Sequence, residues 1–150
     1  MRAVIQRVTS ASILIENNTY SKIESGYLIF LGVETNDTRE DALWLAQKIS
    51  KLRLFVDSSG NMNRSINDVN GEILLVSQFT LHAKTKKGNR PSFIKAAKSQ
   101  EAILLYQEFI IKLDMITNKK VKSGKFGASM VIESINDGPV TILIDTKNKE

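Results

Sequence analysis

The sequence has no cysteine, one histidine and only two prolines among its 150 residues. Without cysteine there is no disulfide framework, no thiolate zinc site, no iron–sulfur cluster and no cysteine nucleophile. The single histidine, His82, excludes a two-histidine metal site within one chain. A serine–histidine–aspartate triad would have to use this same residue. We therefore expect neither a metal nor a cofactor.

Long apolar runs are also missing. None approaches the roughly 20 residues that a membrane-spanning helix needs, and Gln6 and Arg7 interrupt the N-terminal run where a signal peptide would be apolar. With 42% apolar residues the chain is too apolar to be disordered, and its length suits one domain. We expect a soluble, cytoplasmic protein with no membrane partner. It would form a single domain over residues 1–150, with a polar tail at 145–150 that frays over its last four residues.

Positive charge is concentrated in the second half of the chain. Residues 1–75 carry a net charge of −1, and residues 76–150 carry +6. Residues 84–98 hold six basic residues and no acid, and residues 112–125 hold five lysines and one aspartate. Such focused charge suits a polyanion such as RNA. The alternative is a solvated lysine-rich face that only aids solubility, and charge alone favours it.

Apolar patterning predicts strands interleaved with two helices. The first helix begins near Thr38, with Asp41 three residues later as an N-cap-like partner, and the second spans 99–115. The expected strands cover residues 3–8, 11–16, 19–24, 26–33, 54–56, 72–81, 126–135 and 140–145, with turns at 17–18 and 136–139. This order predicts an α+β fold, with an antiparallel or mixed, barrel-like sheet and two main helices.

Polar side chains gather at the end of the strand expected over residues 72–81. Ser77, Gln78 and Thr80 follow a buried run, and His82 comes directly after them. The simplest explanation is a strand that emerges into solvent; the alternative is an active site, because rigid elements position catalytic groups there. A Ser77 or Thr80 nucleophile would need His82 or a lysine as its base. Backbone N–H groups at such a strand end can instead stabilise an oxyanion.

Gly138-Pro139, just before the last strand, is a second unusual feature. An X–Pro bond adopts the cis form at modest cost, although base rates favour trans. The sequence contains no P-loop, no Gly-x-Gly-x-x-Gly and no paired-carboxylate signature.

Five segments carry a resemblance that spans Met1 to about Asp145. They are MRAVIQRV at the start, SQFTL at 77–81, GNRPSF at 88–93, SGKFGASM at 123–130 and NDGPVT at 136–141. Together, and in this order, they are far more specific than any single motif. The sequence resembles the D-aminoacyl-tRNA deacylase family, first called D-tyrosyl-tRNA deacylases.

The resemblance implies a homodimer with active sites at its interface and aminoacyl-tRNA as substrate. The reaction would hydrolyse the ester of D-Tyr-tRNA and other D-aminoacyl-tRNAs, with mischarged glycyl-tRNA as a further candidate, releasing free tRNA. Gly138 and Pro139 would be cis and reach from one subunit into the other's site. Their backbone carbonyls would meet the substrate amino group and exclude L-amino acids sterically.

The resemblance also implies roles for the remaining site residues. Ser77, Gln78, Phe79 and Thr80 would line the catalytic pocket. The N–H groups near Phe79 and Thr80 would hold the carbonyl oxygen while the ribose 2′-hydroxyl helps to activate water; a Thr80 nucleophile is the alternative. The other implied roles are bracing of the pocket and its loop by Arg7 with Gln78, packing around the terminal adenosine by Phe126 and Met130, and phosphate contacts by Lys84, Lys86, Lys87, Arg90 and the lysines of 119–125.

Two other functions remain open. A non-catalytic RNA-binding module would keep the fold and the basic face, but has no need of both SQFTL and NDGPVT. A small-molecule esterase would use Thr80 with His82, so it predicts complete loss of turnover in His82→Ala.

Overall fold

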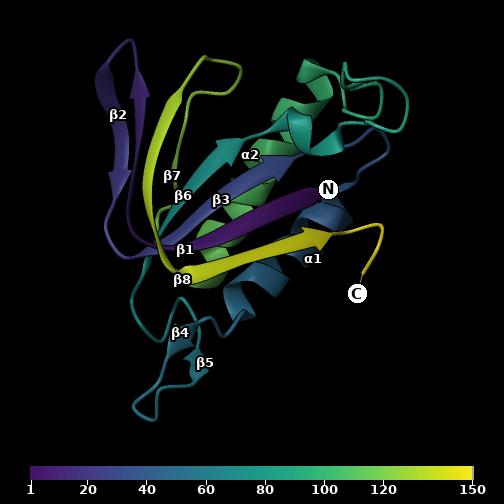
Figure 1. Cartoon of the computed structure of the whole chain (residues 1–150). Helices are drawn as coiled ribbons and strands as arrows, with labels where there is room; N and C mark the ends of the chain where they lie inside the picture. The colour runs from purple at the N-terminus through teal and green to yellow at the C-terminus, as the bar shows by residue number, and fades with distance from the viewer. Residues whose placement is uncertain (150) are drawn as a thin grey trace.

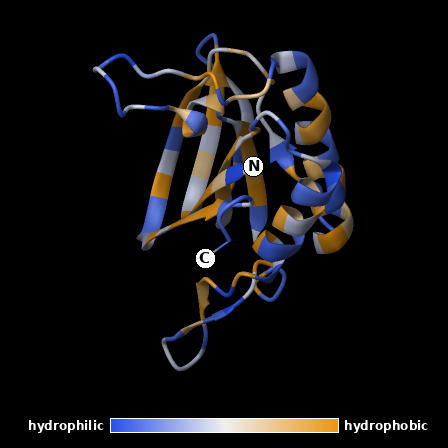
Figure 2. Ribbon diagram, turned by 90° about the vertical axis from the view of Figure 1, so that its right-hand side faces the viewer, coloured by the Kyte–Doolittle hydropathy of each residue, from blue (hydrophilic) through white to orange (hydrophobic). Residues whose placement is uncertain are grey.

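The computed structural model describes residues 1–149 as a six-stranded mixed sheet with both long helices on the same face (Figures 1 and 2). The six strands of this sheet are β1 (Arg2–Ile15), β2 (Asn18–Ile23), β3 (Gly26–Gly32), β6 (Glu72–Ser77), β7 (Lys122–Ser123) and β8 (Val131–Asp145). Two short strands, β4 (Phe55–Val56) and β5 (Met62–Arg64), form a separate antiparallel pair. The helices are α1 (Arg39–Lys51), α2 (Ser99–Thr117) and the short 3-10 helix η1 (Phe79–His82). The predicted α+β class with a mixed, barrel-like sheet is confirmed. No helix within residues 1–149 is long and apolar enough to span a membrane.

Strand β3 lies at the centre of the sheet and has a core on each face. Tyr27, Ile29 and Leu31 face the helices, whose apolar stripes pack against them. Leu28 faces the opposite way, into a smaller core under the curled half of the sheet. Alternate side chains of β3 therefore enter cores on opposite faces of the sheet. Both faces of the strand are buried, as its unbroken apolar sequence predicts.

Strand β1 pairs with three others because it runs the whole length of the sheet. Its first half pairs antiparallel with β3, and its second half pairs with β2. The last strand, β8, pairs with β1 from Arg2–Asp145 to Leu14–Val131. On the other side of β3, β6 and β7 continue the sheet in parallel.

The sheet curls until β2 approaches β6 and β7 (Figure 1). Two polar contacts cross this gap. Glu72 Oε2 accepts from the Glu24 N–H at 2.7 Å, and Lys122 Nζ donates to the Lys22 carbonyl at 2.8 Å. These contacts nearly close the sheet into a barrel.

Both long helices begin where the sequence predicts. Thr38 and Asp41 form a complete capping box at the start of α1, each side chain accepting from the other's backbone N–H. Helix α2 begins at Ser99 and runs two residues past the predicted Met115, because Asn118 takes the left-handed conformation that ends it.

Several strand boundaries differ from prediction. Residues 2–15 form one strand, β1, where two strands at 3–8 and 11–16 were predicted. The hairpin turn is centred on Glu16–Asn17, both with positive φ, rather than on Asn17–Asn18. Strand β6 ends at Ser77, because the chain turns there into η1. Residues 126–130 are irregular, and 131–145 form one strand in place of two. Local patterning did not reveal β5 or β7, which are only three and two residues long.

The predicted break at 136–139 is a bulge within β8. The register with β1 shifts between Gln6–Thr141 and Val8–Asn136, so residues 137–140 loop out opposite Arg7. The Gly138–Pro139 loop is thus held at both ends by the same strand pair.

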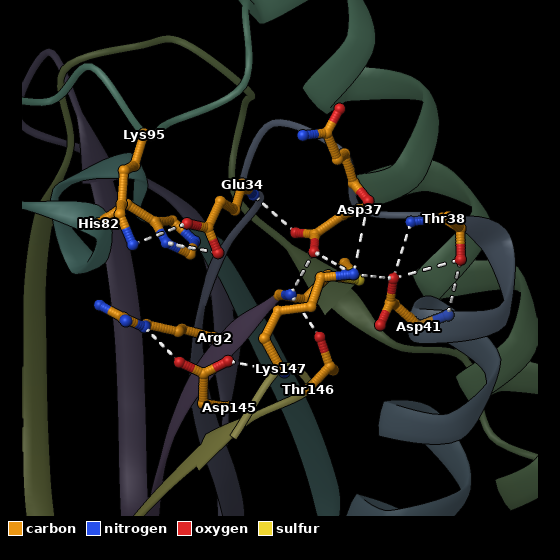
Figure 3. Close-up of polar contacts among 12 residues, drawn as sticks. Arg2, Glu34, Asp37, Thr38, Asp41, His82, Lys95, Asp145, Thr146 and Lys147 are labelled. Carbon is orange, nitrogen blue, oxygen red and sulfur yellow. Dashed lines mark hydrogen bonds and ion pairs between the residues drawn. The ribbon is translucent and has the colours of Figure 1, made fainter. Parts of the chain in front are cut away.

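The C-terminal segment is held in place rather than frayed (Figure 3). The Met1 ammonium donates to Asp37 Oδ1 at 2.7 Å and to Thr146 Oγ1 at 2.6 Å. Lys147 Nζ lies 2.7 Å from Asp41 Oδ2. Burial alone would raise the pKa of Asp41, but hydrogen bonds led by that from Lys147 hold it at about 2. The predicted fraying is wrong for Lys147; Glu150 lies outside the described residues.

Removing the cap of α1 should destabilise the fold. Thr38→Ala leaves the Asp41 N–H without its side-chain acceptor, so the free energy of unfolding should fall by about 1 kcal/mol in urea denaturation. Thr38→Ser should restore it. Thr35→Ala, at an exposed threonine of the same loop, is the matched control, and an equal loss there would contradict the capping role.

Candidate active site

Helix η1 begins at the end of a rigid strand and leaves two backbone donors free. The Gln78 N–H closes the ladder by donating to the Leu31 carbonyl at 2.8 Å. The first N–H groups of a helix have no partner within it. The N–H groups of Phe79 and Thr80 donate to no backbone carbonyl within residues 1–149. Two donors on one rigid turn can stabilise a developing oxyanion.

A cleft of about 430 Å³ lies beside η1. Ser77, Gln78 and Phe79 line it together with Phe93 and Phe126. The Phe79 side chain is 57% exposed. It meets Phe93 edge-on, with ring centroids 5.0 Å apart. The cleft is therefore mostly apolar and aromatic, with a few polar groups.

Helix α2 supports the far side of this cleft. Its first residues, Lys98 and Ser99, lie at the edge, where the helix dipole favours negative charge. Tyr106 packs against Phe126, with centroids 5.5 Å apart, and donates its hydroxyl to the Leu75 carbonyl at 3.1 Å. Burial raises the pKa of Tyr106, so this phenol stays protonated and acts as a support.

Thr80 faces away from this cleft. Its side chain lines a second, open groove of about 970 Å³ with Arg2, Leu81 and Leu143. The Gln78 amide donates a hydrogen bond to the Thr80 hydroxyl. Phe79 and Thr80, which are adjacent in η1, thus line two different hollows.

His82 is fully buried and does not reach Thr80. Its ring packs against Gly32, where a Cβ would lie 3.0 Å from Nε2. Neither ring nitrogen makes a hydrogen bond of normal geometry among the described residues, and the facing acid, Glu34, lies 4.0 Å from Nδ1. Burial lowers the pKa of His82 and outweighs the opposing effects of Gly32 and Glu34. The hypothetical Thr80–His82 pair is not formed.

Arg7 braces the Gly138–Pro139 loop. Its buried guanidinium donates to the Asp137 carbonyl at 3.1 Å, lies 3.0 Å from Asp137 Oδ2 and also bonds the Leu54 carbonyl. The Gly138–Pro139 bond is cis. Within one chain this loop does not line the cleft beside η1.

Met130 lies apart from Phe126, with which it was expected to act. Its sulfur packs on Gly124, 2.5 Å from where a Cβ would sit, and its side chain lines a separate hollow of about 400 Å³. The structure therefore brings together Ser77, Gln78, Phe79 and Phe126, but not Met130.

The two basic segments differ in how they are used. The loop with Lys84, Lys86, Lys87 and Arg90 is fully exposed, and reciprocal backbone bonds between Lys84 and Ser92 close its base. In the other segment Lys122 pairs with Glu72 at 2.6 Å, and Lys119 bonds Asn70. Only the first segment presents all its charge to solvent.

Sequence reasoning missed Glu34 and Lys95. Glu34 lies two residues after the buried strand β3, and its carboxylate lies 3.4 Å from Lys95 Nζ. An acid at the end of an unbroken apolar run is the same kind of signal that identified Ser77 and Gln78. Within residues 1–149 no three acidic or histidine side chains gather closely enough to hold a metal ion.

Comparison with known proteins gives matches along the whole chain. The family described as D-Tyr-tRNA(Tyr) deacylase matches residues 4–145. The chain is 55% identical to the D-aminoacyl-tRNA deacylase of Flavobacterium psychrophilum, and 56% identical to that of Bacteroides fragilis. Both alignments cover 100% of each chain.

Two solved structures are similar. The c-Myc DNA Unwinding Element Binding Protein shares 40% identity and a TM-score of 0.92, over 97% of this chain and 98% of that one. A probable eukaryotic D-amino acid tRNA deacylase superposes with a TM-score of 0.81 over 95% and 97%. Its identity is only 18%, so it supports the fold alone.

The buried neutral imidazole should make stability depend on pH. Because the pKa of His82 is lowered in the folded state, the unfolded chain binds its proton more readily. The free energy of unfolding should therefore fall as the pH drops from roughly 7 to 5. In His82→Gln this decline should be much smaller, since no other histidine is present. Equal slopes for the two proteins in urea denaturation would contradict this assignment.

Proposed function

Because this chain belongs to the D-Tyr-tRNA(Tyr) deacylase family, we propose that it hydrolyses the ester joining a D-amino acid to the terminal adenosine of tRNA. Its substrates are D-Tyr-tRNA and other D-aminoacyl-tRNAs, with mischarged glycyl-tRNA as a further candidate. The products are the free amino acid and free tRNA, and the reaction takes place in the cytoplasm. The observation that carries this proposal is the pair of free N–H groups of η1 beside an aromatic cleft.

The terminal adenosine occupies the cleft beside η1. A volume of about 430 Å³ suits a nucleoside, and Phe79, Phe93 and Phe126 offer faces and edges against which a base stacks. The adjacent start of α2 favours the nearby phosphate. This placement puts the ester at the edge of the cleft, next to the backbone of η1.

Water attacks the ester carbonyl, and the carbonyl oxygen gains negative charge between the Phe79 and Thr80 N–H groups. The ribose 2′-hydroxyl helps to activate this water. The bond from the carbonyl carbon to the ribose oxygen then breaks, and that oxygen takes up the proton that water released. The Thr80 hydroxyl takes no nucleophilic role in this mechanism, because the base that could activate it, the buried His82, makes no hydrogen bond to it among the described residues.

A second copy of the chain completes the site. The Gly138–Pro139 loop lies outside its own cleft, and the large apolar side chains on either side of it, Ile135 and Leu143, are 62% and 67% exposed. Exposed apolar surface of this kind supports self-association. The loop of one copy enters beside Thr80 of the other, where its backbone carbonyls receive the substrate amino group. The side chain of an L-amino acid would collide with that backbone, so D-amino acids are selected.

The exposed basic loop contacts the phosphates of the tRNA acceptor arm. Lys84, Lys86, Lys87 and Arg90 are all exposed. They stand on the loop between η1 and α2 (Figure 1). Phosphate contacts of this kind position the substrate without reading its sequence.

Nucleic-acid binding without catalysis is the second candidate function. The exposed basic loop favours it, and a relative with 40% identity carries the name of a DNA-binding protein. Under this alternative the cleft would hold a base, and the free Phe79 and Thr80 N–H groups would have no catalytic role.

Hydrolysis of D-Tyr-tRNA and L-Tyr-tRNA side by side, with a chelator present, separates the two functions. We expect rapid release of tyrosine from the D form alone, undiminished by the chelator. Release from neither form, with tRNA still bound, would favour the binding function. Release from both would contradict the selection of D-amino acids by the Gly138–Pro139 loop.

Thr80→Ala should keep substantial deacylase activity, because the backbone N–H survives the substitution. The measurement is kcat on D-Tyr-tRNA, with Ser77→Ala as a matched loss of a neighbouring hydroxyl. A Thr80→Ala protein that is folded and binds tRNA but releases no D-tyrosine would identify the side chain as the nucleophile.

A further inference from the structure

The Glu34 carboxylate lies between two charged or polar groups from distant parts of the chain (Figure 3). Its Oε2 is 4.0 Å from His82 Nδ1, and its Oε1 is 3.4 Å from Lys95 Nζ. The Glu34 side chain is only 14% exposed. Its backbone N–H donates to Asp37 Oδ2 at 2.6 Å, which fixes where the residue stands.

The two partners of Glu34 belong to two separate segments that contribute to the lining of the cleft. His82 ends η1, whose first residue, Phe79, lines the cleft. Lys95 lies between Phe93 and residues 96–98, which also line it. The backbone joins Glu34 to this second segment as well, through a bridge with Ala96 and the Thr35 N–H donating to the Lys95 carbonyl at 2.9 Å.

His82 packs between η1 and β3. It is fully buried against Gly32, and Glu34 is the acid that faces its Nδ1, at 4.0 Å. The segments that carry Phe79 and Phe93 also meet through the edge-on contact of these two rings. Glu34 therefore stands where η1 and the segment 93–98 come together, and the aromatic contact is a second link between them.

We propose that Glu34 is a positioning residue for the deacylase reaction. Its carboxylate, between His82 and Lys95, sets the separation between the η1 donors and the segment 93–98 that lines the cleft. This inference rests on the proposed function, because it takes that cleft as the substrate site. A change in the spacing of these two segments shifts the ester relative to the Phe79 and Thr80 N–H groups, and a misplacement of about 1 Å can cost on the order of 100-fold in rate.

The test compares Glu34→Gln, Lys95→Met and the double variant on D-Tyr-tRNA. Each single variant should lower kcat on the order of 10-fold, while the Kd for uncharged tRNA stays unchanged. The double variant should lower kcat no further than the singles, because both substitutions break the same contact. Lys95→Arg, which keeps the charge, should restore most of the rate.

The matched control is the Glu108–Lys112 ion pair on α2, whose Nζ–Oε1 distance is 3.2 Å. Glu108→Gln and Lys112→Met should leave kcat unchanged. Lys95 is 47% exposed, so Lys95→Met tests the inference even if Glu34→Gln unfolds the protein. If the wild-type protein releases no D-tyrosine, the proposed function fails; if it does and the variants match it, only this inference fails.

Two further outcomes would overturn the positioning role. An increase in Kd for tRNA in Lys95→Met, with kcat unchanged, would make Lys95 a phosphate contact instead. Independent, multiplying losses of kcat in the double variant would show that Glu34 and Lys95 do not act through each other.

Discussion

The pairing of β1 with β8 determines where the candidate site residues lie. These strands join residues 2 and 145 at one end and residues 14 and 131 at the other. The bulge at 137–140 is possible only because the ladder resumes on both sides of it, and Arg7 lies opposite that bulge. The Gly138–Pro139 loop is therefore a fixed projection of the sheet, and it does not line the cleft of its own chain.

A second constraint comes from β3. Both faces of this strand are buried, so polar side chains follow it only beyond its end. Glu34 follows the strand, and the parallel partner β6 ends beside it at Ser77. The parallel ladder thus brings the carboxyl ends of two buried strands to one edge. There the backbone donors of η1, the His82 ring and the Glu34 carboxylate gather, although they come from two separate segments of sequence.

Much of this arrangement could be predicted from the sequence, and the predictions that were wrong failed for physical reasons. The capping residues Thr38 and Asp41 and the stripes of both helices are local signals, and they located the helices to within two residues. The end of β6 was misjudged because an apolar Phe79 and Leu81 continue the strand pattern through a turn that tertiary contacts impose. The single strand 131–145 was divided at Asn136 because a bulge and a hairpin turn use the same residues.

The candidate site residues also divide into those that a local sequence motif located and those that it did not. Ser77, Gln78 and Phe79 are contiguous, so a single motif located them together, and the structure places all three in the lining of the cleft. The split between Phe126 and Met130 depends on how residues 124–130 fold back, which no local pattern encodes. Lys147 looked like solvated charge in the sequence, since its acidic partners Asp37 and Asp41 lie over a hundred residues away.

The long reach of the β1–β8 pairing also governs the order in which the protein is made. Contacts between residues far apart in sequence form late, because their loop-closure entropy must be offset by many contacts at once. During synthesis β1 leaves the ribosome more than a hundred residues before its full-length partner β8. A nascent chain therefore keeps an open strand edge until β8 has been made. The Gly138–Pro139 loop would be assembled in the same step that covers this edge.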